Sequence, residues 1–472
     1  MGWFRDYMAD VNFKGYAVVV LATLVNIPVA GFMQSFGVFV KTFDKYYCPG
    51  DCLQLLGWIA ALPYAINLII CLVVLRIQTR FGDRGPFIIG VILSAGSLVA
   101  TSFVSNIYIM FGSYCLLFGI GSSLVMYVPF AVLDWHFPED HPRHVLATSI
   151  VTLGAPVGVF IMNPLASYLD NREGVGTDGW RYSLRTFAVA ILLLGLLPVT
   201  VMKRPTIVIK RQEEYEEMDG EEGEPTEPKP FISRHFRESF NTLSIMWVLT
   251  IMFISYGIFI PKIHFINYMS ASLNVSEELA AQAIGYEGIA ETISTLTVSL
   301  LGTLLSKHLF YFYLVGCGTL AVANGVLILA DRYFEVVIYC MVHGAMDGFL
   351  MTLTFPIIDL VVKKREHRNY VWGFTQLGIG VGQLIGLPMT GFMYDMTKSY
   401  SSTFCTCAII FGLSFFMVGF VFIGSKIRAY RNNREEEEDK EILSKPKDQL
   451  TIEAPPGGGV DNKGFEDGKD QG

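Results

Sequence analysis

Two pairs of ionisable residues lie within stretches that are otherwise apolar. Glu287 and Glu291 are four residues apart, as are His343 and Asp347, and on a helix this spacing puts both members of a pair on one face. A charged side chain inside a bilayer costs about 2.5–3.5 kcal/mol even on insertion scales, so it usually has a function. A buried carboxyl with no basic residue on its own helix would tend to hold a proton. The sequence therefore predicts a site for proton or ion coupling at these four residues, with Glu291 the strongest candidate.

Each pair also has a structural interpretation. Glu287 and Glu291 could be protonated and hydrogen-bonded between helices, and His343 and Asp347 could be a packing pair whose hydrogen bonds are satisfied. These alternatives stay open, because the sequence does not show which side chains from other helices meet each pair.

Further polar residues in apolar stretches are candidate contacts for a solute: Gln34, Asn163, His264 and Thr295. Pro28 precedes Gln34 in its stretch and Pro164 follows Asn163, and a proline frees a backbone carbonyl and is expected to kink a helix. His264 has the chemistry to bind a carboxylate or a phenol, although a lone His is more often a packing residue. Nearby Lys262 is expected to extend to the membrane interface.

These residues lie in twelve apolar stretches of membrane-spanning length. Their approximate limits are 15–40, 54–75, 86–105, 107–132, 145–169, 183–202, 243–266, 280–304, 309–329, 334–359, 372–393 and 404–424. Each is long enough to cross a hydrocarbon core of about 30 Å. Apolar residues make up 52% of the chain and charged residues only 17%, which excludes an ordinary soluble class. We expect an all-α membrane protein with twelve transmembrane helices in two six-helix bundles.

Two acidic segments lie outside the predicted spans. Of the 43 acidic residues, 22 fall between Lys203 and Asn241 or after Lys426. These segments have too few apolar residues to fold, and docking of cytosolic proteins is an alternative role for them. The expected organisation is a cytosolic N-terminus at 1–14, bundles at 15–202 and 243–425, an acidic linker at 203–242 and a disordered tail at 426–472. The acidic balance argues against a nucleic-acid partner.

The distribution of Lys and Arg predicts the orientation in the bilayer. With the N-terminus inside, 22 of them lie near the spans on the inner side and seven on the outer side, which favours cytosolic termini. We expect a multi-pass protein of the plasma membrane without a cleaved signal peptide. The sequon at Asn274 then faces outward and is a candidate for glycosylation. Cys48 and Cys52 lie in an outer loop, where a disulfide is one alternative.

Gly378, Gly382 and Gly386 repeat every four residues, and such a row lets another helix approach closely. The spans contain no nucleophile–base pair and no metal-ligand spacing. We therefore expect neither an enzyme nor a cofactor or metal site.

Several short motifs lie in a characteristic order along the chain. They are SFGVFVKTF at 35–43, GWIAAL at 57–62, RFGDRG at 80–85, RHVLA from Arg143, GAPVG from Gly154, GWRYSL from Gly179 and GFMYD from Gly391. With these motifs, residues 15–424 resemble the monocarboxylate transporter family of the major facilitator superfamily. The opening signature of that family is reduced here to Gly15 and Tyr16.

The resemblance implies alternating access around a cavity at the bilayer midplane, and an accessory single-span glycoprotein as a partner. Family members that carry lactate with a proton use a Lys where this chain has Gln34. They also use an Asp and an Arg where it has Glu291 and Thr295. A lactate ion would lose its hydration here with little compensation. His264 corresponds to a His in members that resemble carriers of aromatic amino acids and thyroid hormone.

The expected function is secondary transport of a small monocarboxylate or related organic solute, with proton coupling left open. One alternative is a facilitative carrier of amino acids or other zwitterions. Another is a non-transporting receptor or scaffold with the same fold, which the loss of both family cations favours.

Overall fold

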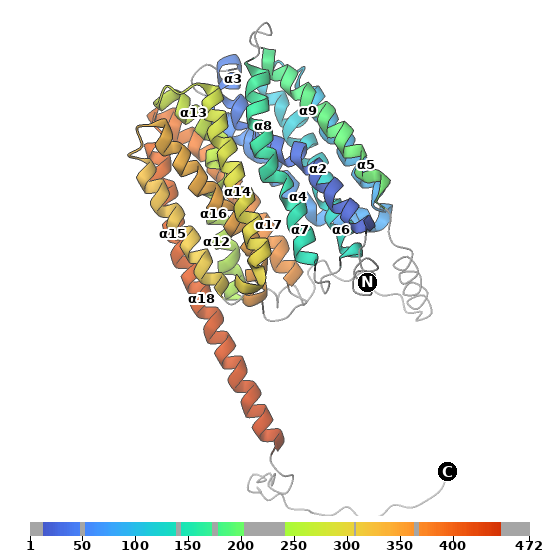
Figure 1. Cartoon of the computed structure of the whole chain (residues 1–472). Helices are drawn as coiled ribbons and strands as arrows, with labels where there is room; N and C mark the ends of the chain where they lie inside the picture. Colours follow the sequence, from blue (N-terminus) through green and yellow to red (C-terminus); the bar gives the residue numbers. More distant parts are fainter. Residues whose placement is uncertain are drawn as a thin grey trace, which may run out of the picture. The chain divides into compact units, whose positions relative to one another are not determined.

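The computed structural model is helical throughout its described residues (Figure 1). These residues are 13–47, 52–137, 143–171, 178–202, 241–305, 308–362 and 368–444. The chain up to Ile423 forms one compact unit, and Gly424 begins a second one. The termini, the acidic linker and the tail beyond Ser444 lie outside the described residues.

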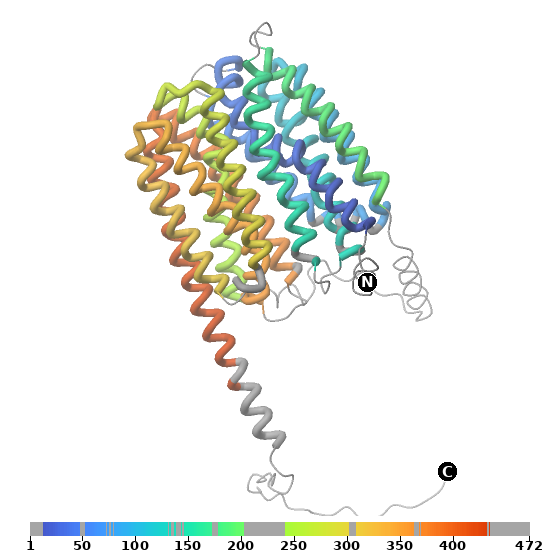
Figure 2. The backbone as a smooth tube through the Cα atoms, viewed as in Figure 1, coloured from blue at the N-terminus to red at the C-terminus, as the bar shows by residue number. Residues whose placement is uncertain are grey.

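The helices of the compact unit fall into two groups. The N-terminal group contains α2 (Phe13–Gln34), α3 (Gly37–Tyr47), α4 (Leu53–Phe81), α5 (Arg84–Thr101), α6 (Leu117–His136), α7 (His144–Thr152), α8 (Gly154–Asp170) and α9 (Gly179–Leu196). Short turns of other helix types are η1 (Ile107–Ile109), η2 (Phe111–Leu116) and η4 (Pro198–Thr200). The C-terminal group contains α12 (Thr242–Ile258), α13 (Ile260–Ser272), α14 (Glu277–Leu305), α15 (Leu309–Leu327), α16 (Tyr333–Val361), α17 (Arg368–Thr397) and α18 (Ser401–Ser444). In the backbone tube, the blue-to-green group lies beside the yellow-to-red group (Figure 2).

Three of the predicted spans are interrupted. The first helix continues through Pro28 and stops at Gln34, so its interruption lies at Ser35 and Phe36 rather than at the proline. The fifth span is divided between α7 and α8, and the seventh between α12 and α13. Pro261 lies in the first turn of α13, where its missing N–H costs nothing. The break before it starts a new helix just ahead of Lys262.

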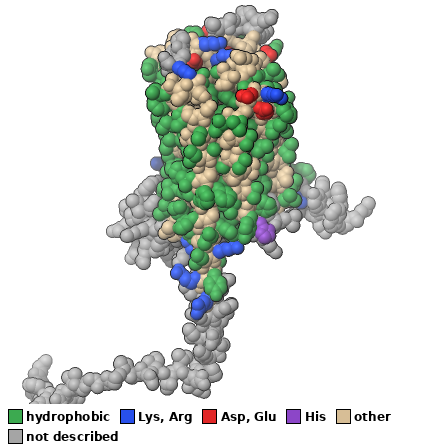
Figure 3. Space-filling view, turned by 90° about the vertical axis from the view of Figure 1, so that its left-hand side faces the viewer, with side chains coloured by type: hydrophobic (Ala, Val, Ile, Leu, Met, Phe, Trp, Pro, Cys, Tyr) green, Lys and Arg blue, Asp and Glu red, His purple; other side chains and the backbone are tan. Residues whose placement is uncertain are grey.

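Apolar length and an apolar outer surface identify a multi-pass membrane protein. Within the described residues, eleven helical stretches are long and apolar enough to cross a membrane. Large apolar side chains face outward, with Val322 67%, Leu300 68% and Ile409 66% exposed, and hydrophobic side chains cover the flank of the molecule (Figure 3). A soluble monomer rarely exposes so much contiguous apolar surface. The long helix α14 is not one of the eleven, so twelve spans stays a prediction.

The glycine row of α17 packs against α12, which confirms the predicted close approach. A Cβ added at Gly382 would lie 2.2 Å from the carbonyl oxygen of Met252, and one at Gly386 would lie 2.1 Å from that of Tyr256. Only hydrogen fits there, so the two backbones are nearly in contact. Because α12 and α17 belong to the same group, this row stabilises the C-terminal group internally.

Candidate functional site

Helices α13, α14 and α16 bring five ionisable residues into one buried cluster. We call it the Lys262 cluster, and it consists of Lys262, Glu287, Glu291, His343 and Asp347, all less than 9% exposed. Two of the residues come from each of α14 and α16, and the interruption before α13 places the lysine opposite them. The cluster thus combines residues that are up to 85 positions apart in the chain.

Lys262 bridges two carboxylates. Its Nζ donates to Glu291 Oε2 at 2.9 Å and to Asp347 Oδ2 at 2.7 Å. The ammonium also lies 5.2 Å from the centre of the Phe259 ring, within the range of a cation–π contact. Among the residues that the structure describes, Lys262 is the one buried Lys or Arg.

Glu287 and His343 form a second contact between α14 and α16. Glu287 Oε1 lies 3.1 Å from His343 Nδ1, and both side chains are fully buried. Two glycines next to the α16 residues make this spacing possible. A Cβ at Gly344 would lie 2.2 Å from the carbonyl oxygen of Glu287, and one at Gly348 would lie 2.5 Å from that of Glu291. The two helices therefore pack backbone to backbone and hold the acidic side chains in fixed register.

The structure corrects three expectations from the sequence. Lys262 does not extend to the membrane interface, because it is 1% exposed and hydrogen-bonded to two acids. Glu291 is not an unpaired carboxyl, since its cation comes from another helix. His343 and Asp347 do not pair with each other, and each bonds instead to a residue across the helix interface.

The N-terminal group contributes two polar residues near the cluster. The Tyr64 phenol on α4 lies within electrostatic range of Lys262, Glu291 and Asp347 and beside the Gln34 side chain. The Tyr64 ring centre is also 5.3 Å from that of Phe259. The Tyr64 hydroxyl and Gln34 Oε1 are both buried, and neither has a well-aligned hydrogen bond among the described residues. The site therefore lies where the two groups of helices meet.

The other predicted solute contacts occupy different surroundings. His264 lies buried on α13 with Nε2 3.1 Å from the carbonyl oxygen of Leu387. Thr295 lies one turn beyond Glu291 and packs against Gly348. Asn163 donates a hydrogen bond to the carbonyl of Val159, one turn earlier in α8. Thr295 thus adjoins the cluster, while the hydrogen bond of Asn163 stays within its own helix.

Tyr400 lies beside His264 and forms a hydrogen bond to the same helix, α13. Its hydroxyl accepts a hydrogen bond from Asn267 Nδ2 at 2.8 Å, and its ring centre lies 6.3 Å from that of His264. Burial raises the pKa of the Tyr400 phenol well above its usual range, so this group is a neutral hydrogen-bonding partner at physiological pH.

The Lys262 cluster contains more acids than cations. Lys262 carries one positive charge, whereas Glu291 and Asp347 carry two negative charges when both are ionised. Glu287 and His343 add no net charge when both are charged or both are neutral. A net negative charge in a low-dielectric interior is costly, so a proton or another cation is needed to balance the cluster.

The two groups also meet at the end of the molecule that carries Lys41. Lys41 on α3 forms an ion pair with Glu277 at the start of α14, with 2.8 Å between Nζ and Oε1, and it donates to the Ser270 hydroxyl. A Cβ at Gly37 would lie 2.3 Å from the carbonyl oxygen of Lys262, and one at Gly57 would lie 2.6 Å from that of Leu387. At this end, called the Lys41 end below, the N-terminal and C-terminal groups are in direct backbone contact.

Smaller predictions about the ends of the spans have mixed outcomes. Cys52 is disulfide-bonded, whereas Cys48 lies outside the described residues. Asn274 is exposed between α13 and α14, and its glycosylation stays a prediction. No group of three or more His, Cys, Asp or Glu suited to a metal ion is present among the described residues.

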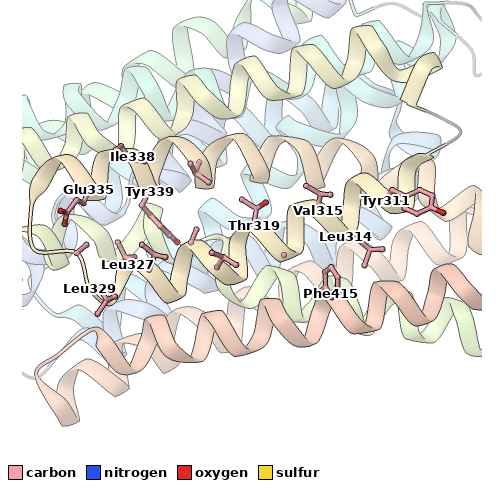
Figure 4. Close-up of a pocket in the computed structure, with 16 residues that line it drawn as sticks. Tyr311, Leu314, Val315, Thr319, Leu327, Leu329, Glu335, Ile338, Tyr339 and Phe415 are labelled. Carbon is pink, nitrogen blue, oxygen red and sulfur yellow. The ribbon is translucent and has the colours of Figure 1, made fainter.

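A large groove lies along the C-terminal group of helices (Figure 4). It has a volume of about 950 Å³ and is lined by residues of α15, α16 and α18, among them Val315, Leu327, Ile338 and Phe415. The lining is mostly apolar and contains none of the cluster residues. The groove is therefore a feature of the membrane-facing surface and not of the candidate site.

Sequence reasoning named every member of the cluster but assigned Lys262 the wrong surroundings and overlooked Tyr64. A signal for Lys262 was present, because a lone lysine just after a proline in an apolar stretch is well placed to balance acids on other helices. Tyr64 lies in the apolar run ALPYAIN, where its type and spacing give no indication of a polar neighbour.

Comparison with known proteins places this geometry in a family. Residues 15–308 and 263–454 match the Major Facilitator Superfamily. Monocarboxylate transporter 10 of Rattus norvegicus is 22% identical over 84% of this chain and 76% of its own length. Monocarboxylate transporter 13 of Bos taurus is 24% identical over 83% of this chain and 85% of its own length.

Solved structures agree on the fold. A D-xylose–proton symporter superposes with a TM-score of 0.65 at 15% identity, over 85% of this chain and 97% of the symporter. The inward open xylose transporter XylE from E. coli gives the same TM-score at 14% identity, over 85% of this chain and 95% of XylE. The fold, the matched residues and the relatives confirm the resemblance drawn from the motifs, and the chain belongs to the Major Facilitator Superfamily.

Proposed function

We propose that this protein is a secondary transporter of the plasma membrane that moves a small organic solute by alternating access. In this proposal α14 is the twelfth spanning helix, since its 29 residues exceed the roughly 20 that a bilayer requires. The termini and the linker at 203–242 lie in the cytosol, and the Lys41 end faces outward. The two groups of helices are the predicted bundles at 15–202 and 243–425.

The observation that carries this proposal is the Lys262 cluster at the meeting of the two groups. A buried ion cluster contributes little to stability compared with well-packed apolar residues. Ionisable residues in membrane segments that face a bundle interior are functional candidates by default. Family folds of this kind bind solute between their halves, and Tyr64 and Gln34 of the N-terminal group approach the cluster of the C-terminal group.

We assign the proposed roles from the positions of the side chains. The groups proposed to exchange a proton or respond to a charged solute are Glu291, Asp347, His343 and Glu287. Gln34, His264, Thr295 and Asn163 are the proposed solute contacts, with Gln34 and Thr295 nearest the cluster. Because Lys262 is shared by two acids, a change of charge on either acid alters its bond to the other. Solute binding at one acid can thereby be sensed at the other.

Proton-linked transport of a monocarboxylate, with an accessory single-span glycoprotein as partner, is the second candidate. The bridging position of Lys262 favours it, because protonation of Glu291 or Asp347 would free part of the ammonium for a solute carboxylate. In that case uptake increases as the pH on the loading side falls.

Glu291→Gln tests the role of the cluster. The variant keeps the shape of the side chain but cannot ionise, so we expect normal surface expression with reduced uptake or without the pH dependence of the wild type. Uptake is measured in proteoliposomes as counterflow at two pH values with a panel of organic acids, amino acids, creatine and carnitine.

Glu278→Gln is the matched control, since Glu278 is an exposed acid in the first turn of the same helix. If Glu291→Gln takes up solute like the wild type at every pH, the cluster has no part in transport. A receptor or scaffold would give no counterflow with the wild-type protein.

A further inference from the structure

We infer that the transported solute carries a positively charged nitrogen, which the Lys262 cluster binds as the cation it lacks. This inference rests on the proposed transport function and specifies its substrate class. It follows from the charges, the hydrogen-bond partners and the burial of the residues around the cluster.

A solute carboxylate finds no free cation in this region. Lys262 is the one buried Lys or Arg among the described residues, and it already bonds to both Glu291 and Asp347. With Glu291 and Asp347 both ionised, a solute carboxylate placed there would add a second uncompensated negative charge to the buried site. Both the repulsion and the loss of hydration oppose that arrangement.

An ammonium group finds hydrogen-bond acceptors that are not in use. Asp347 Oδ1 and Glu287 Oε2 are buried and have no hydrogen-bond partner among the described residues. The Gln34 amide and the Tyr64 hydroxyl lie beside each other near the cluster, and neither has a well-aligned hydrogen bond among the described residues. A buried acceptor without a donor is costly, and an N–H donor or a cationic methylammonium would compensate for it. The open groups therefore complement a positive charge better than a negative one.

The polar groups around the cluster come from both groups of helices. Gln34 and Tyr64 belong to α2 and α4, while Asp347 and Glu287 belong to α16 and α14. A cationic nitrogen bound among them would thus draw on both groups at once. The cluster accounts for the nitrogen end of the solute, and the rest of the solute, including any carboxylate of a zwitterion, lies elsewhere.

A proton and the solute nitrogen then compete to supply the positive charge that balances the cluster. The titratable groups that face this charge come from five helices: Lys262 on α13, Glu287 and Glu291 on α14, Tyr313 on α15, Tyr339, Cys340, His343 and Asp347 on α16, and Tyr64 on α4. A proton added to either acid beside Lys262 makes the cluster neutral, and the nitrogen loses its counter-charge. Uptake should therefore fall as the loading side becomes acidic, which is the opposite of proton–carboxylate symport.

The test uses pairs of solutes that differ chiefly in the charged nitrogen. The pairs are alanine and lactate, phenylalanine and phenyllactate, and choline and 3,3-dimethylbutanol. Thermal stabilisation of the purified full-length protein reports binding, and counterflow in proteoliposomes reports transport. We expect at least one nitrogen compound to exceed its partner by roughly tenfold or more in apparent affinity, because a site of buried acceptors rejects an analogue without the matching group.

An equal or stronger response from the partner in every pair, including no response from either, overturns the inference. Stabilisation by an amine without counterflow overturns the transport function, and of the inference only the binding of a cationic nitrogen by the cluster remains. Counterflow of lactate without a response to amines keeps the transport function and overturns the inference.

Asp347→Asn ties the preference to the cluster. This variant removes one negative charge, so Lys262 and Glu291 balance each other. The ratio of the apparent affinity for the nitrogen compound to that for its partner should then fall toward one. Glu291→Gln gives the same expectation by the other acid, should Asp347→Asn not yield folded protein on size-exclusion chromatography. Glu278→Gln should keep the full preference, and an unchanged preference in both cluster variants contradicts the inference.

Discussion

At the scale of single residues, the informative feature is the sharing of one lysine by two acids. Glu291 and its family-like position were visible in the sequence, but its partner lies 29 residues away on another helix. Periodicity describes one helix at a time and cannot report which residue of a second helix faces it. The four-residue spacing of both pairs was therefore predictable, and their actual partners were not.

Removing Lys262 alone should lower the free energy of unfolding more than removing Lys262, Glu291 and Asp347 together. Lys262→Met leaves two buried acids without a cation, and breaking such an arrangement typically costs about 3–5 kcal/mol. The triple variant Lys262→Met, Glu291→Gln, Asp347→Asn has no charge to compensate and should recover most of that loss. Denaturant unfolding of the purified variants in detergent measures both. A triple variant as unstable as Lys262→Met would show that the charge imbalance is not the cause.

At the scale of helices, glycines set the distances that matter. The row on α17 was recognisable from its four-residue repeat, whereas Gly344 and Gly348 on α16 were not singled out, although they share that spacing. The breaks at Ser35 and Phe259 were also not foreseen. Neither is a proline or glycine, and each break depends on how neighbouring helices pack.

The α14–α16 contact should not tolerate a methyl group. Gly344→Ala would put a Cβ 2.2 Å from a backbone oxygen that cannot move independently of its helix, and such overpacking typically costs about 1–3 kcal/mol. Gly325→Ala on α15 is the matched control, because an added Cβ there meets nothing within 4 Å. We expect a clear loss of thermal stability and uptake only for Gly344→Ala. Equal stability of the two variants would contradict the close approach.

At the scale of the whole molecule, the N-terminal and C-terminal groups are in contact at the Lys41 end. Eleven of the predicted spans correspond to helical stretches long and apolar enough to cross a membrane, because bilayer thickness dictates the length of a span locally. Contacts between the groups could not be predicted, since they join residues far apart in the chain, such as Lys41 and Ser270, which are 229 positions apart. They also describe one state of a molecule that is proposed to alternate between at least two.

The ion pair at this end should bias that alternation modestly. Glu277→Lys replaces an attraction to Lys41 by a repulsion, and partly exposed pairs contribute about 0.2–1 kcal/mol, or roughly a 1.5- to 5-fold change in population. Spin labels at Lys45 and Ser272, both exposed, should show more of the longer distances by pulsed electron spin resonance. The swapped pair Lys41→Glu, Glu277→Lys should restore the original distribution. An unchanged distribution in Glu277→Lys would show that the pair does not influence the conformation.

The short helix α13 links the charged cluster to the Lys41 end. A rotation of this helix about its first residues therefore moves its two ends by different amounts. Its 13 residues extend about 20 Å from the break at Phe259. A rotation of about 10° around that break would move Ser272 by about 3 Å but Lys262, less than one turn from the pivot, by under about 1 Å. The lysine can therefore stay with its two acids while the far end of its helix separates from α3. The break at Phe259 thus allows the Lys41 end to open while the Lys262 cluster keeps its geometry.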